Sequence, residues 1–171
     1  MKRLIMKKTI VLAGGCFWGV EAYYKKLKGV INTQVGYCNG NYANPTYEEV
    51  CDEKATHAEA VWIEYDDALM TLDKLLMHMF RFIEPTSVNR QGHDEGIQYR
   101  TGIYYQQEND ATIAKQFIKQ EQQKYQEKIT VEVIPLNGFY DAETYHQDYL
   151  DKNPRGYCHI NLGMIKKEEQ K

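Results

Sequence analysis

The stretch at residues 8–29, KTIVLAGGCFWGVEAYYKKLKG, changes from one hydrophobic pattern to another. Residues 8–13 are a short apolar run rich in β-branched side chains, which is typical of a strand. Two glycines, Gly14 and Gly15, break this run, and a helical pattern begins near Cys16 and stops at Gly29. We therefore predict a strand, a tight turn and a helix, with Cys16 at the start of the helix.

The rest of the chain mixes strands and helices without a strict alternation and without a glycine-rich nucleotide fingerprint. Residues 84–100 are polar and interrupted by glycine, which predicts a long functional loop. We predict an α+β fold, a two-layer α/β sandwich with a mixed sheet and a ferredoxin-like core. One catalytic domain is expected at residues 1–171, with a core at about 8–160 and a charged tail at 161–171. The further strands are predicted at residues 30–37, 57–65, 101–105 and 129–135, and the further helices at residues 72–83, about 106–128 and 141–150.

Composition limits the classes of function. The 171 residues are 43% hydrophobic and 26% charged, as in ordinary globular proteins, and 21 Lys+Arg against 24 Asp+Glu give a net charge of −3. The sequence has no basic patch, so we do not expect nucleic acid as a partner. The apolar run at residues 9–13 is shorter than the roughly 7 to 15 apolar residues of a secretory signal, and no run approaches the ~20 residues that span a bilayer. We expect a cytoplasmic monomer that does not enter membranes.

Four cysteines stand at positions 16, 38, 51 and 158, and no two of them form a CxxC pair. Structural zinc sites usually bring their ligands in close pairs, so we expect no metal site. In a reducing compartment these cysteines are free thiols, each either a small buried hydrophobe or a reactive group.

Two residues carry chemistry on position alone. Cys16 faces the positive end of the predicted helix, which favours the thiolate and predicts a lowered pKa, although an inert buried cysteine closing the turn would have the same position. Glu59 shares a strand face with Val61 and Ile63, where burial raises the pKa of a carboxyl group. The simpler reading of Glu59 is a salt bridge at a sheet edge.

The segment at residues 15–19, Gly-Cys-Phe-Trp-Gly, resembles the GCFWG signature of A-type peptide methionine sulfoxide reductases. The resemblance extends over about residues 8 to 160, with the order and spacing of the family. The further matching segments are Gly36-Tyr37, Asn44-Pro45-Thr46-Tyr47, His57-Ala58-Glu59, Arg90-Gln91-Gly92, Gln98-Tyr99-Arg100, Phe139-Tyr140, Tyr145-His146-Gln147 and Gly156-Tyr157-Cys158.

The departures from the family pattern are few. Ala55-Thr56 replaces the usual Thr-Gly, and Glu84 replaces the Asp of Asp-Pro-Thr. Cys38 stands where the family often has Ala or Thr, which by analogy makes it dispensable. The chain lacks the additional C-terminal cysteine of some members, which argues against a relay of three cysteines.

The resemblance implies thiol-dependent reduction of methionine-S-sulfoxide, free and in proteins, as repair of oxidative damage. Cys16 would be the nucleophile and Glu59 the proton donor. Tyr47 and Tyr99 would donate their hydroxyls to the sulfoxide oxygen, and Asp94 would hold the polar side of the site.

The same resemblance implies that Phe17 and Trp18 form an apolar seat for the substrate methyl group, although packing at the helix start would explain both rings. Attack leaves Cys16 as a sulfenic acid, which a second thiol converts to a disulfide. Cys158, in a glycine-flanked coil, is the preferred resolver, with Cys51 or Cys38 as alternatives. Thioredoxin, or dithiothreitol in its place, would be the reductant, and no prosthetic cofactor is expected.

Two other functions remain open. A cysteine acyl hydrolase would use Cys16 with His57, His93 or His146 as base, and would need an imidazole within ~3 Å of the sulfur. A binding module rich in aromatic residues would leave Glu59 on an apolar strand face without a reason.

Overall fold

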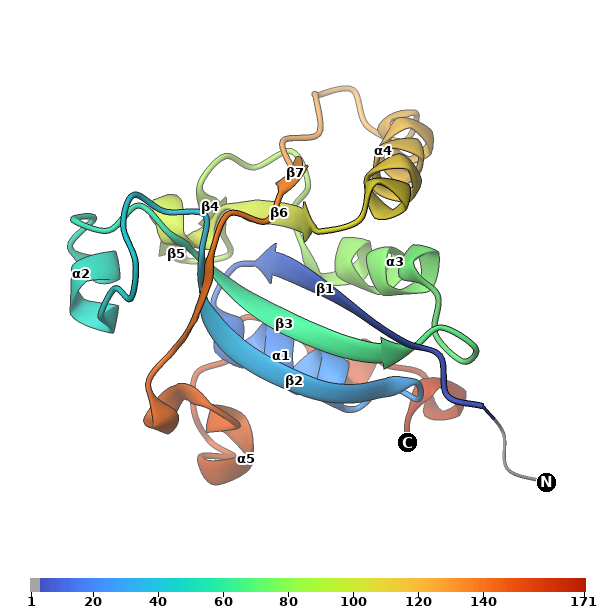
Figure 1. Cartoon of the computed structure of the whole chain (residues 1–171), viewed down its shortest axis with the longest axis horizontal. Coiled ribbons are helices and arrows are strands. Elements are labelled where there is room, and N and C mark those ends of the chain that lie inside the picture. Colours follow the sequence, from blue (N-terminus) through green and yellow to red (C-terminus); the bar gives the residue numbers. More distant parts are fainter. Residues whose placement is uncertain (1–3) are drawn as a thin grey trace.

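The strand, turn and helix predicted for residues 8–29 are confirmed. The computed structural model describes residues 4–171, with strand β1 at Lys7–Gly14 and helix α1 at Phe17–Lys25. Gly15 and Gly29, on either side of the helix, have φ angles of 92° and 93°, which residues with a side chain rarely adopt. These glycines reverse the chain twice, so that α1 lies against the sheet that β1 enters (Figure 1).

A six-stranded sheet forms one layer, in the order β7-β6-β1-β3-β2-β8. All neighbouring strands are antiparallel except β6 and β7, which are parallel. The four strands β6-β1-β3-β2, with α1 after β1 and α3 after β3, have the order of a ferredoxin-like core. The predicted fold class is therefore confirmed. The strands are β2 (Val30–Cys38), β3 (Ala58–Asp66), β6 (Thr101–Tyr105), β7 (Glu132–Pro135) and β8 (Phe139–Asp141).

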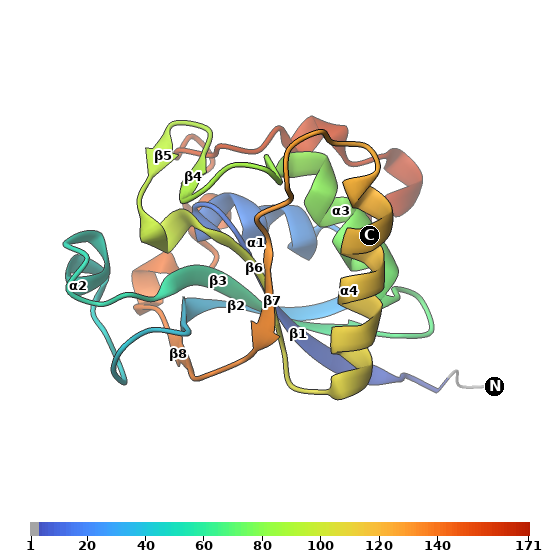
Figure 2. The same cartoon turned by 90° about the horizontal axis from the view of Figure 1, so that it is seen from above.

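Helices form the second layer, on one face of the sheet (Figure 2). Helix α3 (Leu72–Phe82) begins at Thr71, whose side chain accepts a hydrogen bond from the Lys74 amide as an N-cap. Helix α4 (Glu108–Gln122) packs on α3 and beside β6. No helix among residues 4–171 is long and apolar enough to cross a membrane.

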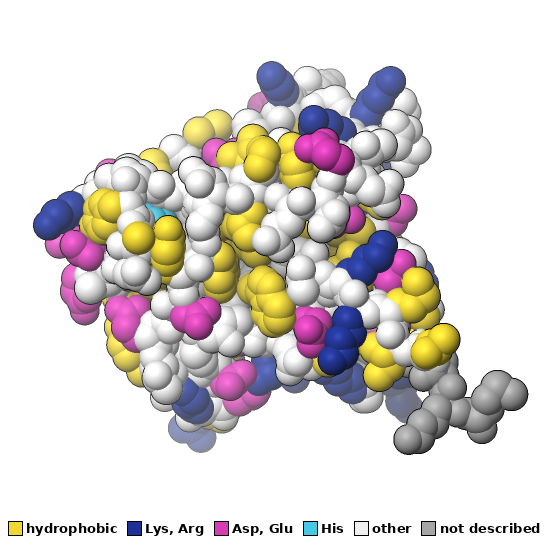
Figure 3. All heavy atoms as spheres, viewed as in Figure 1, with side chains coloured by type: hydrophobic (Ala, Val, Ile, Leu, Met, Phe, Trp, Pro, Cys, Tyr) yellow, Lys and Arg dark blue, Asp and Glu magenta, His cyan; other side chains and the backbone are white. Residues whose placement is uncertain are grey.

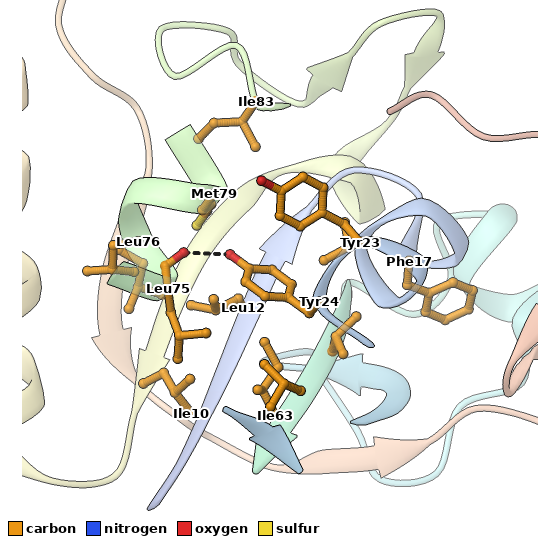
Figure 4. Close-up of a cluster of buried hydrophobic side chains, with 14 of the residues drawn as sticks. Ile10, Leu12, Phe17, Tyr23, Tyr24, Ile63, Leu75, Leu76, Met79 and Ile83 are labelled. Atoms are coloured by element: carbon orange, nitrogen blue, oxygen red, sulfur yellow. Dashed lines mark hydrogen bonds between the residues drawn. The ribbon is translucent and has the colours of Figure 1, made fainter. Parts of the chain in front are cut away.

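The main core lies between the sheet and helices α1 and α3 (Figure 4). Alternate residues of the strands, among them Leu12 and Ile63, meet the rings of α1 and the aliphatic side chains of α3. The Tyr24 hydroxyl, fully buried, donates to the Leu75 carbonyl at 2.7 Å, which satisfies the one polar atom of this ring. The strand face predicted from Glu59, Val61 and Ile63 is thus the face that turns toward the helices.

The opposite face of the sheet has a smaller cluster of buried side chains, which includes Ala60, Tyr104 and Cys38. Leu136 and Phe139, from the segment that leads into β8, pack against this cluster. The space-filling view of this side shows hydrophobic side chains interspersed with charged ones (Figure 3).

One prediction near the C-terminus is wrong. Residues 141–150 do not form one helix: Asp141 ends β8, a 3-10 turn covers Thr144–His146, and α5 covers only Tyr149–Lys152. The helix cannot continue because Asp148 has a φ of 55°, in the left-handed region. Residues 161–171, the expected charged tail, form the 3-10 turns Leu162–Met164 and Lys167–Glu169, and Ile165 between these turns is buried in the main core.

Other boundaries shift by a few residues. Helix α4 ends at Gln122 rather than near residue 128, because the Gln122 side chain donates to the Glu127 carbonyl and accepts from the Ile129 amide, which closes a turn. Strand β7 accordingly begins at Glu132. The polar loop at 84–100 has short elements of its own, β4 (Arg90–Gln91), β5 (Asp94–Glu95) and a 3-10 turn at Ile97–Tyr99. A short helix, α2 (Tyr47–Cys51), lies between β2 and β3.

Candidate active site

Cys16 occupies the turn between β1 and α1, as the N-cap residue of the helix. Its side chain is buried, at 7% exposure, beneath the C-terminal segment. A Cβ atom added at Gly15 would lie 2.8 Å from His159 Nε2, and one added at Gly19 would lie 3.1 Å from Cys158 Sγ. The two glycines of the GCFWG segment therefore allow residues 158–159 to cross directly over the turn that carries Cys16.

Glu59 lies beside this turn, on β3, and is 1% exposed. The amide of Phe17, the first residue of α1, donates to Glu59 Oε1 at 3.2 Å, so the carboxyl group and the cysteine are adjacent. Burial raises the pKa of Glu59 to about 8, with a smaller contribution from the charge of Asp94 and against the opposing effect of the Phe17 amide. This agrees with the raised pKa expected from the strand pattern, and it favours the protonated carboxyl group at neutral pH.

The expected lowering of the Cys16 pKa is wrong. Burial raises the pKa of this thiol far above its ordinary value, and the neighbouring charge of Glu59 adds to the rise. The Trp18 amide, at the helix start, acts in the expected direction but is outweighed. Cys16 is therefore a protonated thiol in the free protein, because loss of water weighs more than the end of a nine-residue helix.

Tyr47 and Tyr99, predicted to bind the sulfoxide oxygen, are both half-buried. Tyr47 begins α2, and Tyr99 ends the 3-10 turn before β6. Burial raises the pKa of each phenol, and the charge of Glu59 raises both further. The two hydroxyls thus share the surroundings of Glu59 and keep their protons for donation.

Asp94 belongs to the β4–β5 hairpin at the rim of the site. Its Oδ2 accepts a hydrogen bond of 2.9 Å from the Tyr157 hydroxyl, and its charge raises the pKa of both Glu59 and Cys16. Tyr157 has a pKa raised to about 12, through burial and this hydrogen bond. The hairpin is in this way joined to the residue that precedes Cys158.

The four cysteines are free and differ in position. Cys158 is half-buried, points its Sγ at the Ile160 carbonyl (3.2 Å), and adds to the rise in the Cys16 pKa. Cys51 is exposed on α2, and Cys38 is fully buried in the cluster on the far face of the sheet. Of the three candidate resolvers, Cys158 is the one that crosses the Cys16 turn.

Phe17 and Trp18 differ in their access to a substrate. Phe17 is 1% exposed and packs on Tyr37 and His146, with ring centroids at 5.6 and 5.2 Å. Trp18 is half-buried, stacks on Tyr149 at 3.7 Å, and donates from Nε1 to His146 Nδ1 at 2.9 Å. The partly open indole is the better candidate for contact with a substrate methyl group, and both rings pack on His146.

Sequence reasoning missed the residues that support the site from the C-terminal part of the chain. Glu143 accepts from the Tyr37 hydroxyl (2.7 Å) and from the Tyr47 amide (2.9 Å), which fixes the start of α2. His146 is 1% exposed and holds the Trp18 indole, with its ring 4.5 Å from that of Tyr47. Both lie about a hundred positions from their partners, and only the family motif around residues 145–147 marked this region.

The acyl hydrolase alternative finds no base. His57 Nε2 pairs with the Tyr42 carbonyl at 2.8 Å, and His146 Nδ1 is occupied by Trp18. His93 is exposed on the β4–β5 hairpin. Within residues 4–171, no hydrogen bond joins a histidine to Cys16, and no three or more His, Cys, Asp or Glu side chains gather to hold a metal ion.

Comparison with known proteins gives one consistent result. Residues 8–171 match the family model described as peptide methionine sulfoxide reductase. The peptide methionine sulfoxide reductase MsrA of Clostridium acetobutylicum is 55% identical over 160 residues, which are 94% of this chain and 99% of the relative.

Solved structures agree with this match. The crystal structure of Mxr1 from Saccharomyces cerevisiae in reduced form has a TM-score of 0.86 at 38% identity, and covers 91% of this chain and 92% of the yeast chain. Mxr1 in complex with Trx2 has a TM-score of 0.60 at 28% identity, over 84% of each chain.

The domain is a ferredoxin-like α+β fold in which a buried thiol at a helix start lies beside a protonated carboxyl group on a neighbouring strand. This fold and site are those of a thiol-dependent oxidoreductase. The chain belongs to the peptide methionine sulfoxide reductase family. It is an enzyme that reduces methionine sulfoxide with thiols, as the resemblance implied.

Proposed function

We propose that this enzyme reduces the S epimer of methionine sulfoxide, free and in oxidised proteins, with Cys16 as nucleophile and Glu59 as general acid. The observation that carries the proposal is the hydrogen bond from the Phe17 amide to Glu59, which holds a protonated carboxyl group against the turn of Cys16. Sulfoxide reduction needs both a nucleophile for sulfur and a proton for oxygen, and this turn supplies the two together.

In the reductive step the substrate oxygen lies between Glu59 and the hydroxyls of Tyr47 and Tyr99. Glu59 gives its proton to this oxygen, and its carboxylate then lies beside the Cys16 thiol and takes the thiol proton. The sulfur of Cys16 attacks the substrate sulfur, the oxygen passes to Cys16, and methionine leaves. The balance is one thiol and one sulfoxide giving one sulfenic acid and one thioether.

The polar and apolar sides of the site divide the remaining work. Asp94, held by Tyr157, lines the polar side. Trp18, supported by Phe17 and His146, lies where it can receive the substrate methyl group. Mutual support of this kind keeps the reacting groups in one geometry before substrate arrives.

In the recycling step the thiol of Cys158 attacks the sulfenic sulfur of Cys16, which forms a disulfide and releases water. Thioredoxin, or dithiothreitol, then reduces the disulfide, and no prosthetic group takes part. The yeast relative in complex with Trx2 supports a thioredoxin-like partner. Free thiols at all four cysteines favour a cytoplasmic location, and we propose a monomer with one catalytic domain over residues 1–171.

A single-turnover assay on separated sulfoxide epimers tests this scheme. Cys158→Ser should release about one methionine per enzyme from the S epimer, because attack by Cys16 does not need the resolver. Thioredoxin-driven turnover should fail in the same variant. Cys16→Ser should release none, whereas Cys38→Ser, at a buried site on the far face, should behave as wild type.

Peptide mapping after one equivalent of substrate identifies the second thiol. A link from Cys16 to Cys158 is expected. A link through Cys51 or Cys38, or normal thioredoxin turnover by Cys158→Ser, would show that the resolver is misassigned. Methionine release by Cys16→Ser would remove the nucleophile from the proposal.

A further inference from the structure

The last residues of the chain, 166–171, fold back onto the outer ends of α1 and α3 (Figure 2). We call these residues the C-terminal clasp. The Lys28 amide donates to the Glu169 carbonyl (2.9 Å), the Lys171 amide donates to the Lys26 carbonyl (2.9 Å), and Leu27 forms a β-bridge with Gln170. The clasp is therefore joined to the end of α1 through backbone hydrogen bonds on both sides of Gln170.

A charged cluster locks the clasp to α3. Arg81 donates from both terminal nitrogens to the two oxygens of Glu169, at 2.7 and 2.8 Å, the two-pronged geometry of a strong ion pair. Behind this pair lies His78, which is 2% exposed. Its Nε2 is 3.7 Å from Glu169 Oε2, and its Nδ1 shares a hydrogen bond of 2.7 Å with the Tyr23 hydroxyl. The Glu169 side chain is 18% exposed, so the pair is shielded from solvent.

The clasp affects the position of Cys158, the proposed resolving cysteine, because the chain is attached to α1 or its end both before and after Cys158. Upstream, Lys25 on α1 forms ion pairs with Asp148 (2.6 Å) and Asp151, and Trp18 stacks on Tyr149. Downstream, the clasp is joined to Leu27, just beyond the C-terminal end of the same helix. The segment at 152–165, which carries Cys158, is thus a strap with both ends fixed on the helix that Cys16 begins.

We propose that Glu169 and Arg81 are positioning residues for disulfide formation: the ion pair fixes the downstream end of the strap so that Cys158 reaches the sulfenic acid of Cys16. This inference rests on the proposed function of Cys158. Fixing both ends of a strap raises the effective concentration of the group it carries at the target, and releasing one end lowers it. The bond formed is the Cys16–Cys158 disulfide, and the sulfenic oxygen leaves as water.

The test compares Glu169→Ala with Glu168→Ala, a neighbour in the same turn that is exposed and loses the same charge. In rapid-quench experiments with one equivalent of substrate, methionine release and loss of the Cys158 thiol are followed separately. Glu169→Ala should release methionine at the wild-type rate but lose the Cys158 thiol at least ~5-fold more slowly, since only the second step needs the strap. The sulfenic acid should correspondingly react more with a dimedone probe. Glu168→Ala should match wild type in all three readings.

Arg81→Lys guards against a folding defect, since a single ammonium keeps the charge but not the two-pronged contact. It should show the same separation of the two rates to a smaller degree. Equal thiol-loss rates in Glu169→Ala, Glu168→Ala and wild type would overturn the positioning role, and so would equal slowing of both steps. Absence of methionine release in the wild type would instead overturn the proposed function itself.

Discussion

Glu59 and Cys16 are adjacent, and burial keeps the proton on both at neutral pH. Each charge opposes the other, since the carboxylate of Glu59 raises the pKa of the thiol. Proton loss from the two groups is therefore coupled. In the proposed mechanism the substrate oxygen takes the carboxyl proton, and the carboxylate left beside the turn would then accept the thiol proton. On the proposed mechanism the pair would become reactive only when a sulfoxide is present, which would limit oxidation of the free enzyme.

The pKa of about 8 at Glu59 predicts a pH dependence of the reductive step. The group is protonated below this value and can donate, so the single-turnover rate should fall as the pH rises above about 8. Glu59→Gln should be slower by about 10²-fold or more at neutral pH and should lose this decline, because an amide has no proton to give.

Glu64→Gln is the matched control for this measurement, since Glu64 is on the same strand but binds Asn32 at the surface. It should follow the wild-type profile. A rate for Glu59→Gln within a factor of ~3 of wild type would mean that another group is the acid.

Thr71 offers a test of how helix α3 is held in place. Its hydroxyl caps the helix by accepting from the Lys74 amide, and the residue is exposed. Thr71→Ala should lower the free energy of unfolding by about 0.5–2 kcal/mol, as loss of an N-cap does, and leave methionine release unchanged. Chemical denaturation measures the first and the single-turnover assay the second. Thr71→Asn should retain the wild-type stability, because asparagine is also a good N-cap. If the Thr71 methyl group stabilised the helix by packing instead, this variant would be as unstable as Thr71→Ala.

Sequence patterns predicted the elements whose signals are local. The β1–α1 turn, α3 with its Thr71 cap, and the buried face of Glu59 follow from periodicity and caps within a few residues. Strand β8 and the short helix α5 could not be predicted in this way. Pairing of Asp141 with Gly36, a contact across about a hundred positions, decides the first, and the left-handed backbone of Asp148 decides the second.

The candidate site shows the same division. The pattern at Glu59 was sufficient to predict a raised pKa. The pKa of Cys16 was predicted in the wrong direction because its burial and its proximity to Glu59, more than forty positions away, outweigh the helix start, and neither is visible in the nearby sequence. The clasp was equally hidden, because its charged residues have the composition of a solvated tail and only the partner Arg81 on α3 makes them structural.

The charged cluster that joins the clasp to α3, formed by Arg81, Glu169 and His78, predicts how the stability of the fold responds to acid. Arg81 holds the pKa of Glu169 at about 2, below its ordinary 4.5, so this group stabilises the fold fully above about 4.5 and loses its contribution as the pH falls to 2. Burial lowers the pKa of His78 from 6.5 to about 4. Between these two pH values His78 binds a proton in the unfolded chain but not in the folded one, so its contribution also destabilises the fold on acidification.

Denaturant unfolding at a series of pH values measures the Glu169 contribution by comparing variants with the wild type, because the raised pKa of Glu59 adds a pH dependence of the opposite sign between about pH 8 and 4.5 to every curve. Glu169→Gln should flatten the part of this curve between about pH 4.5 and 2, because the amide does not titrate. The exposed neighbour variant Glu168→Gln should leave that part of the curve unchanged. Parallel curves for Glu169→Gln and wild type would show that the ion pair does not contribute to acid stability.

Cys16 stands near the beginning of the chain and Cys158 near its end, yet the strap brings residue 158 over the turn of residue 16. A disulfide between them would close almost the entire domain into a covalent ring and, on chain entropy, oppose unfolding by roughly 5 kcal/mol. During each catalytic cycle the molecule would thus alternate between an open and a ring-closed chain. A translocating protease pulls its substrates by one end of the chain. In the oxidised form such a pull would extend only the segments outside the ring, whereas in the reduced form it would unfold the whole sheet.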